Sequence, residues 1–300
     1  MKKKTYLFAL MAMVLTLGSC SDNENGIGGE TSKYITVSTS IGNMTRVATD
    51  ANGGQTFEEG DEISVYAWIG APTVAPETRE RVVNNAINKL TNGSWVATPQ
   101  MLWKNNRDKH YFIGVYPTAA ISDLSAGEYT FDVNKQTESD LLVAVNKDGL
   151  SYNVDEQQTV PLTFTHVMAK LVVNLTYKNQ WGGIPTVEKV VVGNAAKEAT
   201  INYLTKVVTP STTAKEDFSL PEITENTKYV SVIIPQEDVK QLTIVIGGKN
   251  FVYDNGTPFK LESGKITTVN LEVGRDEIKL GDVKITNWED GSTFSGVALN

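Results

Sequence analysis

Histidine, the commonest general base, occurs only twice in this 300-residue sequence, as His110 and His166. His110 stands at the start of a predicted strand, and His166 lies between two predicted strands. The sequence contains no HExxH, CxxC or GxSxG motif and no phosphate-binding loop, the patterns that commonly accompany catalytic or metal-binding residues. We therefore predict that both histidines are hydrogen-bonded structural residues.

Paired carboxylates are the other candidates for chemistry, because glycoside hydrolysis needs only two acids at a suitable separation. The pairs are Glu58-Glu59, Asp61-Glu62, Asp276-Glu277 and Glu289-Asp290. Each lies next to glycine or a predicted turn, where solvated charge is the default. The turn Glu289-Asp290-Gly291 offers ligands for a loosely held calcium, although the EF-hand spacing is absent. An acid-pair hydrolase stays open as an alternative, but we expect no enzyme activity, no catalytic residue, no cofactor and no metal site.

The one cysteine, Cys20, closes a segment with the features of an export signal. Three lysines at positions 2–4 precede an apolar run from Tyr6 to Leu17, which is too short to span a bilayer. The following Leu17-Gly18-Ser19-Cys20 resembles the lipobox cut by lipoprotein signal peptidase, which implies a lipid anchor on Cys20. An ordinary signal peptide with a chance cysteine is the alternative. A single cysteine forms no disulfide within the chain and no cysteine metal cluster.

The charge and composition of the chain limit the classes of binding partner that we expect. Without residues 1–19, which hold three lysines and no acid, the net charge falls from −8 to −11. A negative surface without basic runs argues against nucleic-acid binding. The polar segment Ser21–Asn25 and the glycines up to Gly29 predict a flexible tether. Acidic residues directly after the cysteine also resemble the signal that sends Bacteroidetes lipoproteins to the outer face of the outer membrane.

Alternation of apolar and polar residues with a period of two dominates the rest of the chain, which predicts an all-β fold of short antiparallel strands. The predicted strands are Tyr34–Ile41, Ile63–Ile69, Tyr111–Tyr116, Tyr129–Val133, Leu141–Val145, Lys170–Tyr177, Val187–Val192, Tyr229–Ile234, Leu242–Ile246 and Lys265–Val273. Hairpin turns are predicted at Asn92-Gly93, Asp148-Gly149, Gly247-Gly248 and Asn255-Gly256. Glu80–Leu90 fits a helix and a strand equally well.

Several segments, in their order along nearly the whole chain, resemble the fimbrillin family of Bacteroidetes surface pili, in its fimbrillin-like branch. They are Ile35–Ile41 with Thr45-Arg46, Phe57–Tyr66, Leu102-Trp103 leading into Tyr111–Pro117, Ser139–Ala144, Leu162–Leu171 and the ending around Ile285–Gly291. The resemblance implies two tandem transthyretin-like antiparallel β-sandwich domains after a lipoprotein signal peptide. The expected division is signal peptide 1–19, tether 20–32, N-terminal domain 33–157 and C-terminal domain 158–300.

The same resemblance implies a structural or adhesive subunit of cell-surface fimbriae, exported as an outer-membrane lipoprotein. It also implies proteolytic processing near the end of the first strand, where Arg46 stands, followed by assembly through strand exchange. The expected partners are other fimbrillin subunits, the outer membrane through the lipid anchor, and a host or bacterial surface ligand. A surface arginine at a strand end is the alternative for Arg46.

Two further alternatives depend on where side chains point. A monomeric surface glycan-binding lipoprotein would present the five tryptophans, at positions 68, 95, 103, 181 and 288, as an outward-facing platform. The segment Ile278–Trp288 fits either a strand donated to a neighbouring subunit or the last strand of its own domain, with Trp288 packed at its end. The second interpretation is favoured, and it leaves Ser292–Asn300 as a short tail. Gly281 suggests a bulge or a hinge within the segment.

Overall fold

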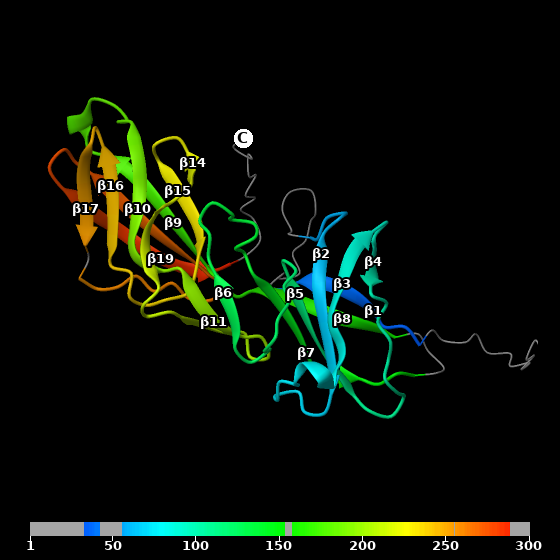
Figure 1. Ribbon diagram of the computed structural model, residues 1–300. Helices are drawn as coiled ribbons and strands as arrows, with labels where there is room; N and C mark the ends of the chain where they lie inside the picture. Colours follow the sequence, from blue (N-terminus) through cyan, green and yellow to red (C-terminus); the bar gives the residue numbers. More distant parts are fainter. Residues whose placement is uncertain (1–32, 43–55, 154–157, 255, 289–300) are drawn as a thin grey trace, which may run out of the picture.

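The computed structural model describes residues 33–42, 56–153, 158–254 and 256–288 (Figure 1). Over these residues the chain forms nineteen strands in four sheets, with two single-turn 3-10 helices, η1 (Thr78–Glu80) and η2 (Asn179–Trp181). The predicted all-β class is confirmed. Cys20 and Arg46, the two residues assigned roles from the sequence, lie outside the described residues.

The N-terminal half is one seven-stranded sheet, on the right of Figure 1, with the order β1-β8-β7-β5-β2-β3-β4. Its strands are β1 (Thr36–Ile41), β2 (Glu62–Ile69), β3 (Arg81–Thr91), β4 (Ser94–Thr98), β5 (His110–Tyr116), β7 (Leu142–Leu150) and β8 (Thr159–His166). Every pair in it is antiparallel except β1 with β8, which is parallel. The sheet curls, so that its two edge strands β1 and β4 approach each other.

Both faces of this sheet are buried in its middle. The inner face encloses a core to which Ile63, Val65 and Phe112 belong. The outer face contributes Tyr66 and other residues to a second and larger core. Because β2 is buried on both faces, its sequence reads as a nearly continuous apolar run.

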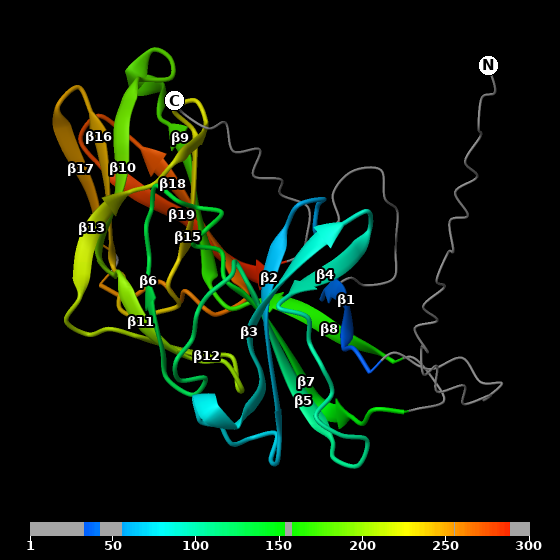
Figure 2. The same ribbon diagram turned by 45° about the vertical axis from the view of Figure 1, so that its right-hand side comes forward.

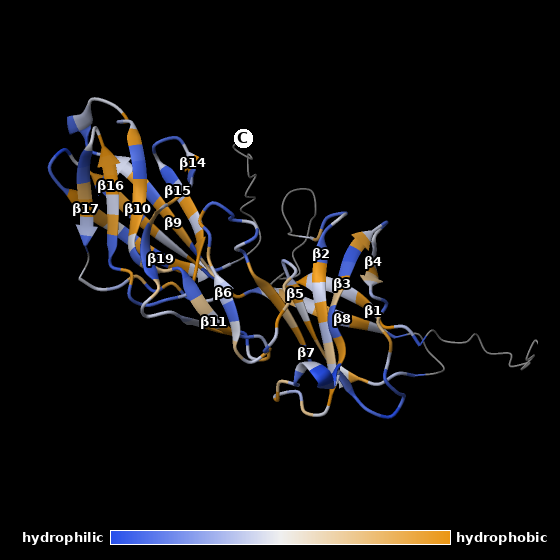
Figure 3. Ribbon diagram, in the orientation of Figure 1, coloured by the Kyte–Doolittle hydropathy of each residue, from blue (hydrophilic) through white to orange (hydrophobic). Residues whose placement is uncertain are grey.

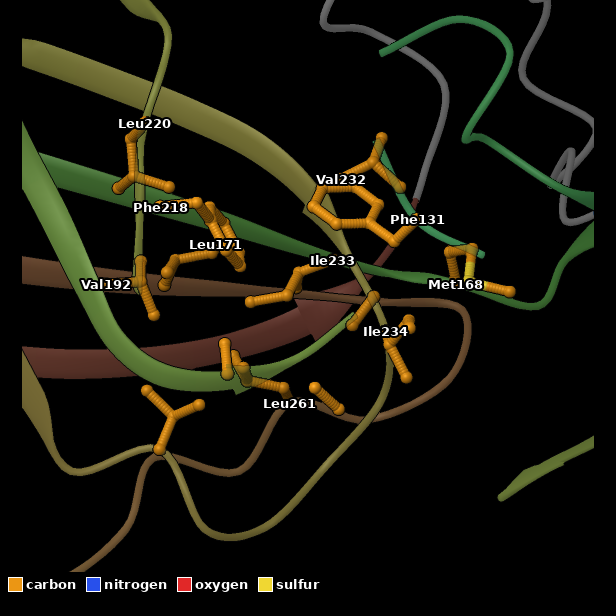
Figure 4. Packing of buried hydrophobic residues seen from close by; sticks show 14 of the residues in the cluster. Phe131, Met168, Leu171, Val192, Phe218, Leu220, Val232, Ile233, Ile234 and Leu261 are labelled. Carbon is orange, nitrogen blue, oxygen red and sulfur yellow. The ribbon is translucent and has the colours of Figure 1, made fainter. Parts of the chain in front are cut away.

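Two sheets of the C-terminal half share that larger core (Figure 2). One has the order β14-β15-β9-β18-β19 and contains β9 (Ala169–Tyr177), β14 (Glu222–Thr224), β15 (Lys228–Ile233), β18 (Lys265–Val273) and β19 (Ile278–Asn287). The other has the order β13-β10-β16-β17 and contains β10 (Val187–Ala196), β13 (Lys215–Ser219), β16 (Gln241–Ile246) and β17 (Lys249–Asp254). Figure 4 shows their side chains interleaved, with Val192 of β10 facing Leu171 of β9 and Ile233 of β15. In Figure 3 apolar and polar residues alternate along these strands, as a sheet with one buried face requires.

A small fourth sheet connects the halves. It contains β6 (Gly127–Thr130), which precedes β7 in the chain, paired with β11 (Glu198–Asn202), which in turn pairs with β12 (Val207–Pro210). Strand β8 follows the predicted division at residue 157, yet it pairs with β7 and β1 in the first sheet. The division itself stays a prediction, and these pairings favour a change of unit after His166.

Two of the four predicted hairpin turns take the expected form. Asn92-Gly93 joins β3 to β4 and Gly247-Gly248 joins β16 to β17, both as two-residue loops with positive φ at each residue. The segment Glu80–Leu90 is a strand from Arg81 onward, because Arg81–Thr91 form β3, and Glu80 ends the 3-10 helix η1. Asn255 lies outside the described residues.

The hairpin predicted at Asp148-Gly149 is wrong, because both residues lie inside strand β7. The pairing of β5 with β7 shifts register there, from His110 opposite Leu150 to Phe112 opposite Asn146. Gly149 has φ +66, and a Cβ on it would come within 2.8 Å of the Tyr111 ring. Gly149 therefore allows a bulge in β7 and the close approach of the Tyr111 ring, and it does not form a hairpin turn.

The favoured interpretation of Ile278–Trp288 is confirmed. Ile278–Asn287 form β19, the last described strand, which pairs with β18 along its whole length, and Trp288, directly after it, is buried. The register shifts between Asn270 and Leu271, opposite Gly281, so the predicted bulge is also present.

One glycine of the first sheet gives a stability test. A Cβ on Gly114 of β5 would lie 2.6 Å from Cζ of Phe164, a residue of β8 that belongs to the N-terminal core. We expect Gly114→Ala to lower the free energy of unfolding by about 1–3 kcal/mol, because the buried ring has little room to move. Urea denaturation measures it. Gly193→Ala is the matched control, because the atom nearest to its new Cβ is the end of the flexible Gln241 side chain; an equal loss in both variants would contradict this account.

Candidate functional site

His110 occupies a closed hydrogen-bonding position. Its Nδ1 donates to the carbonyl of Asp108 at 3.0 Å, and its Nε2 accepts from the backbone N–H of Lys104 at 3.1 Å. Trp103 packs edge-on against the ring at a centroid distance of 5.0 Å. Burial lowers the pKa of His110 below its ordinary value. Both ring nitrogens are used by the fold, so the expectation of a structural histidine is supported by its contacts.

His166 sits where the first sheet leads into the second half of the chain. Its Nδ1 donates to Oδ1 of Asp140 at 2.8 Å, and its ring stacks on that of Trp288 at a centroid distance of 4.0 Å. The ammonium group of the buried Lys170 lies 5.2 Å from the centre of the same indole. This cluster fastens the end of β19 to the end of β8, which is a structural role.

The acidic pairs near the first strand hold turns. Asp61 accepts the backbone N–H of Glu58 at 2.7 Å, and Glu59 accepts that of Asn92 at 2.8 Å. The Tyr116 hydroxyl donates to Asp61 at 3.4 Å, and burial together with this carboxylate raises the pKa of Tyr116 to about 12. Glu62 forms an exposed ion pair with Lys89. Among the residues described, no three His, Cys, Asp or Glu side chains gather as a metal site would require, and Glu289-Asp290 lies outside them.

The tryptophans do not form an outward platform. Trp68, Trp103 and Trp288 are 1%, 8% and 4% exposed, respectively. Trp95 and Trp181 are half-buried and lie in different halves of the molecule. A glycan-binding surface built from stacked tryptophans therefore has no support in the described residues.

The first strand is the part of the molecule whose contacts are unusual. Its inward side chains Ile35, Val37 and Ile41 are buried in the N-terminal core, at 3%, 6% and 9% exposure. On one side, β1 pairs with β8 in a parallel register from Thr36 opposite Thr159 to Ile41 opposite Phe164. Hydroxyl pairs follow this register, with Ser40 Oγ 3.1 Å from Thr163 Oγ1. The core and one neighbouring strand thus hold β1 in place.

On its other side, β1 is paired only at its beginning. The backbone N–H of Ile35 donates to Met101 at 2.9 Å, and that of Trp103 donates to Lys33 at 3.2 Å. From Val37 to Ile41, no described residue pairs with this side of the backbone. There β1 faces β4, which itself pairs only with β3. The sheet is therefore curled but not closed.

A groove of about 720 Å³ runs along this opening, and we call it the seam groove. Its lining consists of Thr36–Ile41, Thr56, Phe57, Leu90, Gly93–Trp95 and Thr159. Phe57 packs edge-on against Trp95, Tyr116 and Phe164, at centroid distances of 5.3, 5.3 and 5.1 Å. Trp95 Nε1 donates to Thr39 Oγ1 at 3.0 Å across the groove.

Sequence reasoning named β1 but missed what surrounds it. Strand β8 was missed because Pro161 interrupts an otherwise clear alternation of Val160, Leu162 and Phe164. The sequence suggested Trp95 only as part of a tryptophan platform, and its bond to Thr39 joins residues 56 positions apart. Arg46 comes after the last described residue of the β1 segment, Gly42, and its processing stays a prediction, as does lipidation of Cys20. None of the described helices has the length and apolar character needed to cross a membrane.

The chain is similar to known proteins in its sequence and in its fold. Residues 45–288 match a family described as fimbrillin-like. No curated protein matches the sequence.

Solved structures give the same picture of the fold. A candidate cell adhesion protein from Bacteroides ovatus superposes with a TM-score of 0.62 at 17% identity, over 85% of this chain and 98% of that chain. One from Bacteroides uniformis gives 0.61 at 18% identity, over 78% and 93%. A fimbrial protein from Bacteroides vulgatus gives 0.54 at 13% identity, over 86% and 100%. At these identities the likeness shows that the fold is shared.

The buried histidine beside the first sheet predicts a pH dependence. Because the pKa of His110 is lowered in the folded chain, the unfolded chain binds more protons below pH 6.5 or so. We expect the stability that neutral His110 contributes to be complete above this pH and to be lost as pH falls below it. Denaturation at each pH measures how the unfolding free energy declines between about pH 7.5 and 5.5. In His110→Gln this decline should be smaller than in the wild type, because the contribution of His110 is missing. An identical pH profile in the variant and the wild type would contradict the assignment.

Proposed function

The chain belongs to the fimbrillin-like family, and from this premise we propose that it is a structural or adhesive subunit of cell-surface fimbriae. In this proposal it is exported as a lipoprotein anchored to the outer membrane through Cys20. Cleavage after Arg46 separates the first strand, and other fimbrillin subunits join the chain by strand exchange. The two halves correspond to tandem transthyretin-like β-sandwich domains.

The observation that supports strand exchange is the one-sided attachment of β1. Cleavage at Arg46 would leave β1 bound by its ladder to β8, by the contacts of Lys33 and Ile35 with residues 101–103, and by its side chains. Once β1 departs, the first half of β8 has no partner, because β7 pairs only with Phe164–His166. An unpaired edge beside an apolar core recruits another extended strand.

The strand that replaces β1 has to come from a segment other than β19. Strand β19 pairs with β18 along its length, and Trp288 at its end stacks on His166. Releasing it would expose the C-terminal core to water. We therefore propose that β19 is not the donor strand.

The lipid anchor predicts a simple labelling result. In cells given radioactive palmitate, the wild-type chain should carry label and Cys20→Ala should carry none, because the thiol is the acylated group. Ser21→Ala is the matched control and should stay labelled. Label retained on Cys20→Ala would contradict the anchor.

Processing predicts a defined new amino terminus. We expect subunits taken from assembled fibres to begin at Val47 when sequenced by Edman degradation. Arg46→Ala should abolish fibres seen by electron microscopy, because β1 then stays covalently attached and its site stays filled. Arg79→Ala, at an exposed arginine that forms an ion pair with Glu77, should leave the fibres intact. Fibres of normal length from Arg46→Ala would rule out processing at this residue.

A further inference from the structure

The seam groove lies beside the strand whose replacement the proposed function requires. One of its walls is β1 from Thr36 to Ile41, and the opposite wall comes from β4 and the end of β3, with Phe57 and Trp95 between them. The groove exists while β1 is still in place. It is therefore a surface that an incoming strand meets before any strand has left.

The two ends of β1 differ in how firmly they are held. At the beginning, Lys33 and Ile35 have backbone partners in residues 101–103 in addition to the core. Toward Ile41, the backbone has β8 on one side and the groove on the other. Strand separation begins where the fewest bonds must break together, so β1 should peel from Ile41 toward Lys33.

The groove has the chemistry of a site for an extended chain. Strands β1 and β4 each present a backbone edge that no described strand occupies. Only another extended backbone satisfies a row of such donors and acceptors. The aromatic rings of Phe57 and Trp95 offer apolar contacts to every second side chain of that strand.

The seam must widen to admit a strand. Adjacent strands lie about 4.8 Å apart, so a strand between β1 and β4 needs about twice that separation. Trp95 Nε1 to Thr39 Oγ1 is the one hydrogen bond that the described residues make between β1 and β4. A single neutral hydrogen bond contributes little net stability, so it holds the seam closed only weakly.

We propose that the seam groove is the docking site at which an extended strand with alternating apolar residues, from another subunit, binds before it displaces β1. This inference rests on the proposed strand exchange and adds its order: docking comes first, and β1 is released afterwards from its Ile41 end. The Trp95–Thr39 hydrogen bond is a contact that the incoming strand must break to open the seam.

Exchange kinetics test the order. The probe is a fluorescent synthetic peptide of residues 33–42, which carries the alternation of Ile35, Val37 and Ile41. The protein is the mature chain with a protease site inserted at Arg46, cut so that the original β1 stays bound without a covalent link. If docking precedes release, the rate of peptide incorporation rises with peptide concentration.

Variants on β4 test whether the dependence of the rate on peptide concentration arises from binding in the seam groove. Ser94 lines the groove, whereas Val96, two residues further on the same exposed face, does not. Ser94→Tyr should lower the slope of rate against concentration about tenfold, the change expected when one favourable contact is blocked, and Val96→Tyr should leave it unchanged. Trp95→Phe keeps an aromatic ring but removes the bond to Thr39, so it should raise the slope. Thermal unfolding confirms that each variant is folded.

The outcomes separate the inference from the proposed function. An incorporation rate that does not depend on peptide concentration would mean that β1 leaves first, which overturns docking while strand exchange stands. The same slope in Ser94→Tyr and Val96→Tyr would remove the groove from the mechanism. If the cut chain never takes up the peptide, the proposed strand exchange fails and this inference fails with it.

Discussion

The parallel ladder between β1 and β8 is the contact on which the N-terminal half depends. The first half of β8, from Thr159 to Thr163, pairs with β1 and with no other described strand. Pro161 lies in this stretch, and proline is tolerated where a strand has a free side. Val160 and Leu162 nevertheless form part of the N-terminal core. Strand β1 therefore holds in place a second strand whose side chains the core needs.

The C-terminal half is organised in the opposite way. Its central strands β9 and β18 pair with each other and with a further strand on the outer side of each, and their residues Val173 and Val269 are fully buried. The last strand is fixed at its end by Trp288 on His166. Strand β6 and the outer face of the first sheet join the same core. The C-terminal half is thus held together by its central strands and its shared core. The opening in the N-terminal sheet lies at the seam groove.

Sequence patterns predicted those parts of the fold whose determinants are local. Alternation located β1, β9 and β18, and the glycine dipeptides at 92–93 and 247–248 located two hairpins, because side-chain period and turn geometry are properties of neighbouring residues. Asp148-Gly149 carries the same turn signal, yet a bulge beside Tyr111 uses the glycine instead. The seam groove was beyond prediction, since the parallel pairing of β1 with β8 spans 123 residues at Ser40 and Thr163. Nothing local marks Phe57 and Trp95 as neighbours of that strand.

A strand that folds first and is replaced later, as we propose for β1, would have to meet two opposing requirements. Burying Ile35, Val37 and Ile41 contributes about 1.5–3 kcal/mol for each side chain, which together is of the order of the whole net stability of a domain. Loss of β1 without a substitute would therefore unfold the first sheet. A route in which the incoming strand binds before β1 leaves avoids that intermediate, because the core is covered throughout. The opening between β1 and β4 leaves backbone groups unpaired, which costs free energy. The proposed route gives a physical reason for the fold to keep the sheet open there.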